Sequence, residues 1–396
     1  MNVLILEPYI DGHHANYLKW LLREIRRRKW RAILATTRQT LSDLRFKEIC
    51  AEADDIRICE LTISDSPIFA SHRYVKMVHR EWTFWRAFQK AVARVAAVEE
   101  IGAIILPYLE YCFYAIAFFG APFSDIPWCA ISMRLTAIGR NSGGLTGGSK
   151  KWRFAKRILG SKNLKAFFVI NPSVVQFPPS WLTAREQLLL CYLPDPAELA
   201  LPNVRNVLRQ KFRISETAVV ILVYGYIDER KGITSLLEAV AQASNLDDVV
   251  VFIAGIQSKS FGNTLKSGRF EKLIVNGKLM VLNQVLNDEL QGQVFAVSDA
   301  VWLGYRNHRY MSGVMVLAGQ ASLPVIGANF GEIGYLISRY NFGIAVDIDQ
   351  ANDIAVAIDK LLNKESRQAM GNRGHSLFST HTVENFGVTV LGSFDN

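Results

Sequence analysis

The stretch ILVYGYIDERKGITSLLEAV, residues 221–240, decides the fold class of this chain. Its first part is an apolar strand pattern that ends before Gly225, and its last part has apolar residues at helical spacing. Between them, Arg230 and Lys231 stand at the start of the predicted helix. The free N–H groups and the dipole of a helix start favour an anion, and two cations strengthen that preference. The stretch therefore predicts a strand, a phosphate-binding loop and a helix; the alternative is a solvated basic pair at a turn.

The same alternation of strand and helix patterns continues on both sides of this stretch. Strand patterns occur at residues 3–6, 31–35, 56–61, 103–106, 128–131 and 166–170 before it, and at 249–254, 278–282, 300–303, 324–326 and 344–346 after it. Helical patterns such as residues 15–28 and 79–98 lie between them. Alternating patterns of this kind predict parallel sheets with right-handed crossovers, and therefore an α/β fold.

A proline-rich interruption divides the alternation into two halves. The segment CYLPDPAELALPN, residues 191–203, contains three prolines, which is typical of a linker. We therefore expect two Rossmann-like domains facing a central cleft, at residues 1–192 and 204–375, joined by a linker at 193–203. The last residues, 376–396, form a predicted helical tail.

Composition and charge exclude several classes of protein. The 396 residues are 50% hydrophobic and 20% charged, which supports large cores and argues against intrinsic disorder. Five cysteines without a C-x-x-C spacing argue against a disulfide framework or a zinc ribbon. The apolar run near the start is too short for a signal peptide and residues 104–119 are too short for a membrane span, so we expect a cytoplasmic protein. A net charge of +9 favours an anionic partner, and no nucleic-acid motif accompanies it.

Polar residues after other predicted strands are candidates for a second part of a site. Gly12 lets the backbone approach a ligand, and we prefer His13 to His14 as a catalytic group in the same loop. Glu110 is a second catalytic candidate and Arg134 is a binding candidate, because both follow strands whose carboxyl ends line the ligand crevice. The alternatives are a histidine pair that packs or caps the helix, and ordinary loop charges.

Residues 221–240 resemble the fGxxxxxKGxxxLLxA stretch of retaining glycosyltransferases with the GT-B fold, in particular glycosyltransferase family four. The likeness continues through residues 193–198, 249–257 and 299–346. It implies a hexosyltransferase-type enzyme of polysaccharide or glycoconjugate biosynthesis. Such an enzyme moves a sugar, with retention, from a nucleotide-sugar donor to an acceptor whose identity stays open. The resemblance also implies that no metal or cofactor is required, and that the tail at 376–396 packs back on the N-terminal domain.

The resemblance also implies roles for single residues. Lys231 matches the lysine that holds the donor diphosphate, and Arg134 on the N-terminal domain would bind the acceptor. The complete set expected to bind the diphosphate is Gly12, Gly225, Arg230, Lys231, Ser312 and Gly313.

The chain departs from the family at two acidic positions. The paired glutamates of the family fall on Arg309 and Leu317, so neither carboxylate is present. We expect Gln320 and Asn283 to bind the nucleoside instead, because amides can both donate and accept hydrogen bonds. The missing pair also supports an alternative, a catalytically degenerate GT-B protein that acts as a partner or regulatory subunit. The retained cations at residues 230–231 count against it.

Two basic segments rich in aromatic residues indicate a further partner. They are residues 150–165, with Trp152 and Phe154, and residues 79–90, with Trp82, Trp85 and Phe88. A basic amphipathic helix with aromatic residues can lie in a membrane interface. The pattern predicts peripheral contact with an anionic membrane at the inner face; the alternative is core packing of the aromatic residues. GT-B enzymes that use lipid-linked acceptors often have such a surface on the N-terminal domain, so the resemblance implies a lipid-linked acceptor.

Overall fold

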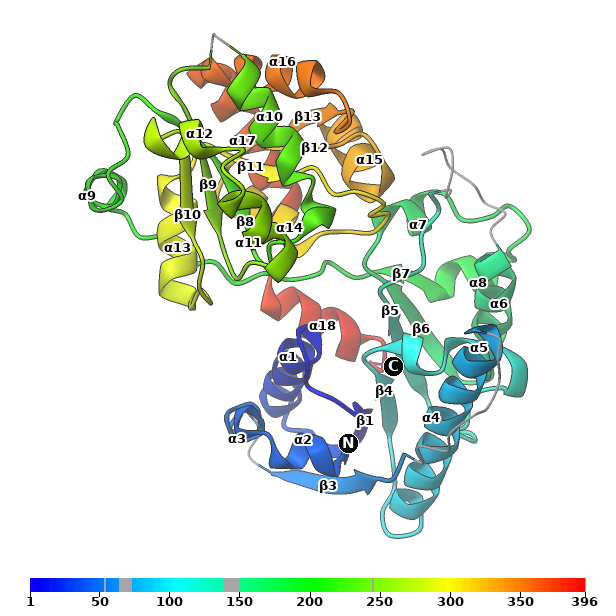
Figure 1. Cartoon of the computed structure of the whole chain (residues 1–396). Helices are drawn as coiled ribbons and strands as arrows, with labels where there is room; N and C mark the ends of the chain where they lie inside the picture. Colours follow the sequence, from blue (N-terminus) through cyan, green and yellow to red (C-terminus); the bar gives the residue numbers. More distant parts are fainter. Residues whose placement is uncertain (53–54, 64–72, 139–149, 244–245, 396) are drawn as a thin grey trace. The chain divides into compact units, whose positions relative to one another are not determined.

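The computed structural model describes residues 1–52, 55–63, 73–138, 150–243 and 246–395 of the chain. These residues form two compact units (Figure 1). Unit 1 holds the described residues of 1–138, 150–194 and 383–395, and unit 2 holds those of 195–382. Each unit is built on one parallel sheet, as the alternation of strand and helix patterns predicts.

Unit 1 contains a sheet of seven strands among its described residues, in the order β3-β2-β1-β4-β5-β6-β7. The strands are β1 (Asn2–Leu6), β2 (Arg31–Thr37), β3 (Ile56–Leu61), β4 (Ala103–Leu106), β5 (Trp128–Ser132), β6 (Leu164–Val169) and β7 (Leu190–Tyr192). All six neighbouring pairs run parallel. The short strand β7 has no counterpart in the sequence prediction, because three residues are too few to show a period.

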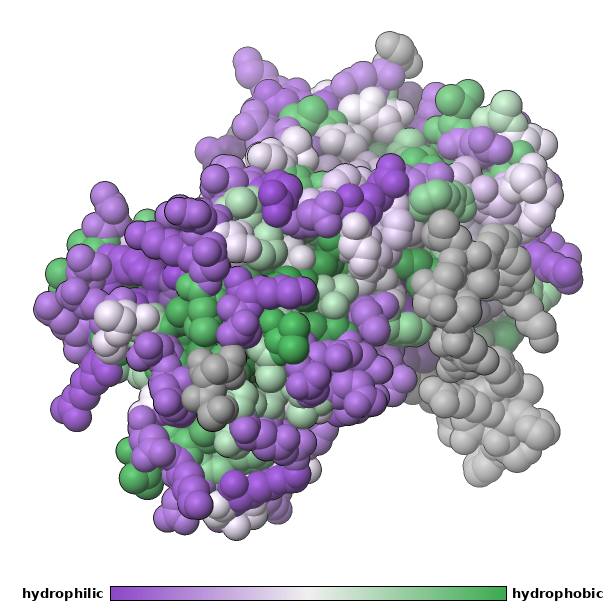
Figure 2. All heavy atoms as spheres, turned by 90° about the horizontal axis from the view of Figure 1, so that it is seen from above, coloured by the Kyte–Doolittle hydropathy of each residue, from purple (hydrophilic) through white to green (hydrophobic). Residues whose placement is uncertain are grey.

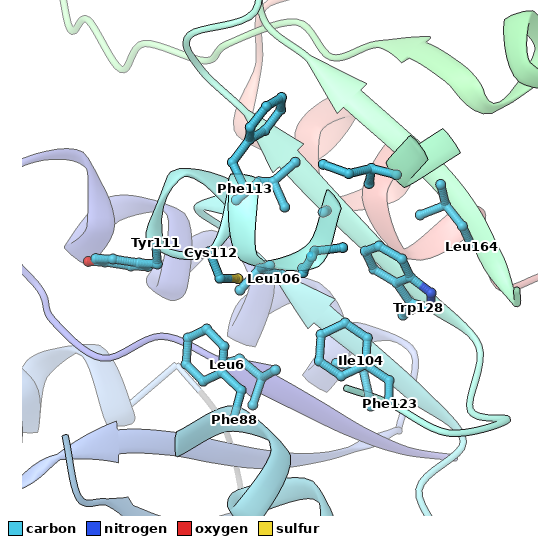
Figure 3. Packing of buried hydrophobic residues seen from close by; sticks show 14 of the residues in the cluster. Leu6, Phe88, Ile104, Leu106, Tyr111, Cys112, Phe113, Phe123, Trp128 and Leu164 are labelled. Carbon is cyan, nitrogen blue, oxygen red and sulfur yellow. The ribbon is translucent and has the colours of Figure 1, made fainter. Parts of the chain in front are cut away.

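Helices follow most strands of unit 1. They are α1 (His13–Arg27), α2 (Arg38–Ser42), α3 (Leu44–Cys50), α4 (Arg73–Ala96), η1 (Leu109–Tyr111), α5 (Phe113–Phe119), α6 (Lys150–Leu159), α7 (Pro172–Gln176) and α8 (Ala184–Leu189). Figure 3 shows part of the core beside the sheet, where Leu6 of β1 and Leu106 of β4 pack with Phe88 of α4. Phe88 is completely buried, and so is Trp152 of α6.

The end of the chain belongs to unit 1. Helix α18 (Val383–Gly392) packs on α1, where the ring of Phe386 lies 4.7 Å from that of Tyr17 and 5.6 Å from that of Trp20. Arg28 and Asp395 add an ion pair at 2.6 Å. Residues 376–382 lie in unit 2 instead, so the exchange between units falls after residue 382 rather than at residue 376.

Unit 2 contains a sheet of six strands among its described residues, in the order β10-β9-β8-β11-β12-β13. The strands are β8 (Val219–Tyr224), β9 (Val249–Ala254), β10 (Leu279–Leu282), β11 (Ala300–Leu303), β12 (Val325–Ala328) and β13 (Gly343–Val346). Strands β8 and β9 are buried on both faces, which explains their continuous apolar runs.

The helices of unit 2 cover both faces of this sheet (Figure 1). They are α9 (Arg205–Lys211), η2 (Glu229–Lys231), α10 (Ile233–Gln242), α11 (Lys259–Lys266), α12 (Glu271–Val275), α13 (Asp288–Val297), α14 (Gly313–Gln320), α15 (Gly331–Tyr340), α16 (Ala351–Leu362) and α17 (Lys364–Phe378). Asp299, just before β11, accepts hydrogen bonds from Arg205, from Arg209 and from the backbone of Val220. This buried network ties α9 to the amino ends of β8 and β11.

The strand order of each sheet reverses once. In unit 1 the chain moves outward from β1 through β2 and β3, then returns to the other side of β1 with β4. In unit 2 the same reversal separates β8 from β11. At such switch points the loops leave in opposite directions, and the carboxyl ends of the two strands form a ligand-binding crevice. The two reversals therefore mark one candidate site in each unit.

Candidate functional site

In unit 2, Lys231 lies at the switch point between β8 and β11. Its Nζ donates to the carbonyl oxygen of Tyr224 at 2.7 Å, at the end of β8. It also donates to the hydroxyl of Tyr305, just after β11, at 3.0 Å, and lies 4.6 Å from the centre of that ring. The ammonium group is therefore held by residues at or after the ends of both strands of the reversal.

Local sequence fixes this loop. Gly232 has a φ of 61°, and an added Cβ would lie 2.3 Å from the carbonyl oxygen of Gly304, so the position needs glycine. The indole N–H of Trp302 donates to the carbonyl of Lys231 at 2.7 Å, and the backbone N–H of Arg306 donates to that of Arg230 at 2.6 Å. Short contacts from β11 and its loop thus hold the cation in place.

The two cations of the loop have different environments. Lys231 is only 8% exposed, and it forms no ion pair with a carboxylate among the described residues. The side chain of Arg230 is 73% exposed, and its Nε pairs with Asp228 at 2.8 Å. A buried cation without a carboxylate is costly unless an anionic ligand can reach it. Lys231 is therefore the stronger candidate for phosphate binding, and Arg230 is secondary.

Contacts lead from Lys231 to the start of α14. The ring of His308 lies 5.3 Å from that of Tyr305, and its Nε2 donates to the carbonyl of Met311 at 3.2 Å. Burial, followed by the cations Arg230 and Lys231, lowers the pKa of His308, which favours its neutral form. Ser312 is the N-cap residue of α14 and makes no side-chain capping bond, and Gly313 has open space around its Cα. The backbone N–H groups at this helix start are therefore available to an anion.

The two residues predicted to bind a nucleoside lie in different places. Asn283 follows β10, and its Oδ1 accepts from the backbone N–H of Gln257 at 3.0 Å, which places Asn283 at the same carboxyl edge of the sheet as Gly225. Gln320 is the last residue of α14 and uses both amide hydrogens, donating to the carbonyls of Ala197 at 2.8 Å and His381 at 3.1 Å. Only the amide oxygen of Gln320 is then left for a ligand.

In unit 1, the reversal between β1 and β4 brings together Glu7, His14 and Tyr111. Glu7 follows β1 and is fully buried, and both its carboxylate oxygens lie 3.2 Å from Nδ1 of His14 in the first turn of α1. The hydroxyl of Tyr111, after β4, lies 3.3 Å from the same nitrogen. Burial raises the pKa of Glu7, while hydrogen bonds from His14, Tyr9 and Tyr111 oppose this rise. The pKa of Tyr111 is raised, first by burial and next by the charge of Glu7.

The neighbouring residues Gly12 and His13 are exposed. Gly12 has a φ of 57° and open space around its Cα, so the backbone there is accessible to a ligand. The side chain of His13 makes no hydrogen bond or ion pair with another described residue, in contrast to that of His14. The sequence prediction prefers His13 as the catalytic group, whereas the buried carboxylate of Glu7 lies against His14.

Glu110 and Arg134 lie close together but serve the backbone. Glu110 accepts from the hydroxyl of Ser132 at 2.8 Å and from the backbone N–H of Arg134 at 2.9 Å, and its Oε1 lies 3.7 Å from Nζ of Lys151. Lys151 also donates to the carbonyl of Arg134 at 2.8 Å, and burial lowers its pKa. The carboxylate thus holds the loop after β5 in shape, while the side chain of Arg134 stays exposed.

A surface of aromatic and basic residues lies on α4, α5 and α6 of unit 1. The ring of Trp85 lies 5.9 Å from that of Phe119, which is 6.5 Å from Phe118, and the guanidinium of Arg157 lies 5.7 Å from the Phe118 ring. Phe118 and Phe119 are 52% and 56% exposed. We refer to these four residues, with Lys156 and Trp181, as the aromatic–basic surface.

The aromatic–basic surface differs from the predicted one. Trp152 and Phe88 belong to the core, as the packing alternative expects, whereas Phe118, Phe119 and Trp181 were not among the predicted residues. An open groove of about 570 Å³ adjoins it, lined by Arg153, Lys156, Arg157, Trp181 and Glu186. Among the described helices, none combines the length and apolar character needed to cross a bilayer. Figure 2 shows one face of the molecule, on which hydrophilic residues predominate and hydrophobic residues form small patches.

The described residues include no group of three or more His, Cys, Asp or Glu side chains that could hold a metal ion.

Comparison with known proteins gives a family match within unit 2 and a structural likeness over the whole chain. Residues 204–376 match the family model of the glycosyl transferases group 1. A comparison with curated protein sequences gives no significant match. Among solved structures, sucrose-phosphate synthase from Thermosynechococcus elongatus superposes with a TM-score of 0.68 at 14% identity, covering 100% of this chain and 98% of that protein.

Two further structures show the same likeness over the full chain. HepE from Anabaena, solved in complex with UDP, has a TM-score of 0.67 at 13% identity and covers 100% of both chains. WaaG, a glycosyltransferase involved in lipopolysaccharide biosynthesis, has a TM-score of 0.62 at 15% identity, covering 99% of this chain and 100% of WaaG. Residues 204–376 therefore carry the sequence pattern of the glycosyl transferases of group 1, and the chain as a whole has the GT-B fold.

Proposed function

We propose that this protein is a glycosyltransferase whose unit 2 binds the diphosphate of a nucleotide-sugar donor. The observation that carries the proposal is the buried ammonium group of Lys231, which has no carboxylate partner among the described residues and lies at the switch point of a sheet that matches the group 1 family. A nucleoside diphosphate leaving group accumulates negative charge as the glycosidic bond breaks. A fixed cation and helix N–H groups stabilise that charge, which is the electrostatic mode of catalysis.

The other residues of the proposed donor site are assigned from their positions at the carboxyl edge of the unit 2 sheet. Arg230, Gly225 and the start of α14 at Ser312 and Gly313 complete the diphosphate site in this proposal. Asn283 contacts the base in this proposal; the support for this role is that Asn283 follows β10, two strands away from β8 on the same edge. The protein's own cations neutralise the diphosphate, so the proposal includes no metal or cofactor.

The nucleotide and the sugar are proposed from the relatives. HepE from Anabaena has been solved with UDP and with UDP-glucose, and it has the fold of this chain. We therefore take uridine diphosphate as the first nucleotide to test and a hexose as the transferred sugar. The resemblance to retaining enzymes supports retention of configuration, which ¹H NMR of the anomeric proton in the product would reveal as a small α coupling from an α-linked donor.

The decisive experiment is binding of nucleoside diphosphates to the full chain. Ligands that bind only the folded state raise its melting temperature, by an amount that follows from affinity and concentration. We expect UDP to stabilise the protein more than GDP, ADP or TDP, and UDP-glucose to do so comparably. No stabilisation by any of the four nucleotides would contradict the donor site.

A degenerate protein without transferase activity is the second candidate. It is favoured by one observation: Leu317 is buried on α14 where the family has a glutamate, and Arg309 replaces the other. Binding and turnover separate the two proposals. UDP binding with no release of UDP from UDP-glucose, across a panel of lipid and glycan acceptors, would favour the regulatory role.

We also propose that the aromatic–basic surface rests on an anionic membrane at its inner, cytoplasmic face, and that the acceptor bound by unit 1, with Arg134, is lipid-linked. Exposed aromatic rings beside arginine and lysine suit the boundary between acyl chains and acidic headgroups. Co-sedimentation with phosphatidylglycerol vesicles tests this. Phe118→Ser with Phe119→Ser should lower binding, whereas Val207→Ser, at an exposed apolar position in unit 2, should not. Equal binding to uncharged phosphatidylcholine vesicles would contradict the electrostatic part.

A further inference from the structure

A polar pocket lies at the amino edge of the unit 2 sheet, whereas Lys231 lies at the carboxyl edge. The pocket has a volume of about 530 Å³. Its walls include Ala218, Asp299 and Pro324, which stand just before β8, β11 and β12. The other walls come from α9, from the start of α17 and from the loops beside them. All of its lining residues therefore belong to unit 2, and none of them is part of the proposed donor site.

Cations outnumber carboxylates in this pocket. Four cations and two carboxylates line it, so its lining residues carry a net charge of +2. Cations that are partly buried beside one another are costly, and an anionic ligand lowers that cost. The cations are Arg205, Arg209, Lys364 and Arg367, and the carboxylates are those of Glu216 and Asp299.

Three guanidinium groups share the carboxylate of Asp299. Nη2 of Arg205 lies 2.7 Å from one of its oxygens, and Nη2 of Arg209 lies 2.6 Å from the other. Nη2 of Arg367 lies 4.0 Å from the first oxygen, which is too far for a hydrogen bond. Burial lowers the pKa of Arg205; the charge of Asp299 opposes this effect, and the charges of the other two arginines reinforce it. A single carboxylate thus leaves the three guanidinium groups with an excess of positive charge.

Hydrogen bonds show which of these cations can reach a ligand. Every nitrogen of the Arg209 guanidinium donates to a backbone carbonyl or to a carboxylate, and this side chain is only 4% exposed. Arg367 uses Nη1 for two carbonyls at the end of α16, whereas its Nε and Nη2 make no hydrogen bond with a described residue. The exposed ammonium group of Lys364 also has no hydrogen bond or ion pair within the described part of the chain. Lys364 and Arg367 are three residues apart on α17, so both lie on the same helix face.

We propose that this pocket binds a phosphate dianion, either free or as the monoester of a small molecule, with Lys364 and Arg367 donating to its oxygens. Guanidinium and ammonium groups form strong charge-assisted hydrogen bonds with phosphate oxygens. Two negative charges also match the net charge of the lining residues. The proposal goes beyond glycosyl transfer, because it concerns the edge of the sheet that lies away from Lys231.

Calorimetric titration and thermal melting of the full chain test this site, in a phosphate-free buffer at about pH 8, where phosphate is mainly a dianion. Inorganic phosphate and glycerol 3-phosphate are the two probes, and glycerol with sodium chloride at matched ionic strength is the control. We expect saturable binding of the phosphate probes and none of the control mixture. Tighter binding of glycerol 3-phosphate identifies a monoester as the ligand, and equal or weaker binding identifies the free ion. No binding of either probe would overturn the proposal.

Matched variants place the phosphate in the pocket. Arg367 is only 15% exposed, and one charge-assisted contact corresponds to about tenfold in affinity or more, so Arg367→Met should weaken phosphate binding by at least about tenfold. Lys364→Met removes an exposed cation and should weaken phosphate binding by about threefold. Lys360→Met removes an exposed cation of α16 outside the pocket and should leave phosphate affinity unchanged. Because Arg367 also holds two carbonyls of α16, melting without phosphate shows whether Arg367→Met is folded. If that variant does not fold, the comparison of Lys364→Met with Lys360→Met still decides, since both lower the net charge by one.

Lys231→Met separates this pocket from the proposed donor site. We expect Lys231→Met to weaken UDP binding and to keep phosphate binding at the pocket, and Arg367→Met to do the reverse. Loss of phosphate binding in Lys231→Met, with wild-type phosphate affinity in both pocket variants, would place the anion at the donor site and overturn the proposal. Phosphate binding that depends on Arg367, in a protein that does not bind UDP, would contradict the donor site and support the pocket.

Discussion

Replacing Lys231 by methionine is the sharpest perturbation of the donor site. Methionine keeps most of the aliphatic stem of lysine but removes the ammonium group. In the structure that group donates to the carbonyl of Tyr224 at 2.7 Å and to the hydroxyl of Tyr305 at 3.0 Å. Lysine has three N–H donors, so one remains for an oxygen of a bound diphosphate. The substitution therefore removes one charge-assisted contact between protein and ligand, together with a charge that burial protects from solvent.

The expected magnitude follows from that single contact. A hydrogen bond to a charged group contributes about 1.5–3 kcal/mol, and about 1.4 kcal/mol corresponds to a tenfold change in affinity. Lys231→Met should therefore weaken UDP binding roughly 10- to 150-fold. Arg230 is 73% exposed and already paired with Asp228, so its contact is screened and contributes about 1 kcal/mol at most. Arg230→Met should weaken UDP binding by about fivefold or less.

Isothermal titration calorimetry of UDP with both variants and wild type measures these differences directly. Thermal melting of the unliganded proteins shows whether Lys231→Met remains folded, since Tyr224 and Tyr305 each lose a partner. Tyr305→Phe, which removes one partner of the ammonium group but keeps the charge, should have an intermediate effect. UDP affinity in folded Lys231→Met equal to that of wild type would refute the assignment of the diphosphate to this lysine.

Three further changes test the structure in other places. Leu317 is 8% exposed, so Leu317→Glu should lower the melting temperature because it buries a carboxylate, whereas Leu317→Met should be nearly neutral. An unchanged melting temperature with tighter UDP binding in Leu317→Glu would instead show that the new carboxylate reaches the ribose. Asp299→Asn leaves the buried guanidinium of Arg209 without its anion, so the free energy of unfolding in urea titrations should fall by about 3 kcal/mol. A loss below about 1 kcal/mol would show that the ion pair between Arg209 and Asp299 does not stabilise the fold. Burial raises the pKa of Glu81 from 4.5 to about 7, so the folded state retains a proton that the unfolded state releases, and stability falls as the pH rises through this window. Glu81→Gln should remove this pH dependence. The difference in the free energy of unfolding between Glu81→Gln and wild type should therefore shift by about 3 kcal/mol in favour of the variant from pH 4.5 to pH 8, as measured by urea unfolding at both pH values.

The sequence by itself determined the two α/β units and the loop that carries Lys231. Apolar runs and helical spacing are local properties, because a strand buried on both faces needs apolar residues throughout and a helix needs them every three or four residues. Residues 221–240 show both patterns with a glycine and two cations between them. The strand ends there in the structure, and the lysine lies at the switch point.

The sequence could not show which of two chemically similar residues is buried and which is exposed. His13 and His14 are adjacent and identical in chemistry, and only the direction of the first turn of α1 exposes one and places the other against Glu7. The same holds for the aromatic residues, since Trp152 has the sequence surroundings of a surface residue but lies in the core.

Tertiary structure alone decided how distant residues combine. Tyr111 is 97 residues from His14, and the two meet because β4 returns beside β1 in the sheet. Arg230 and Lys231 look alike in the sequence, but the close approach of β11 buries the lysine and leaves the arginine exposed. Burial and pairing depend on which elements pack together, and this depends on contacts between segments far apart in the chain, which no local pattern of residues specifies.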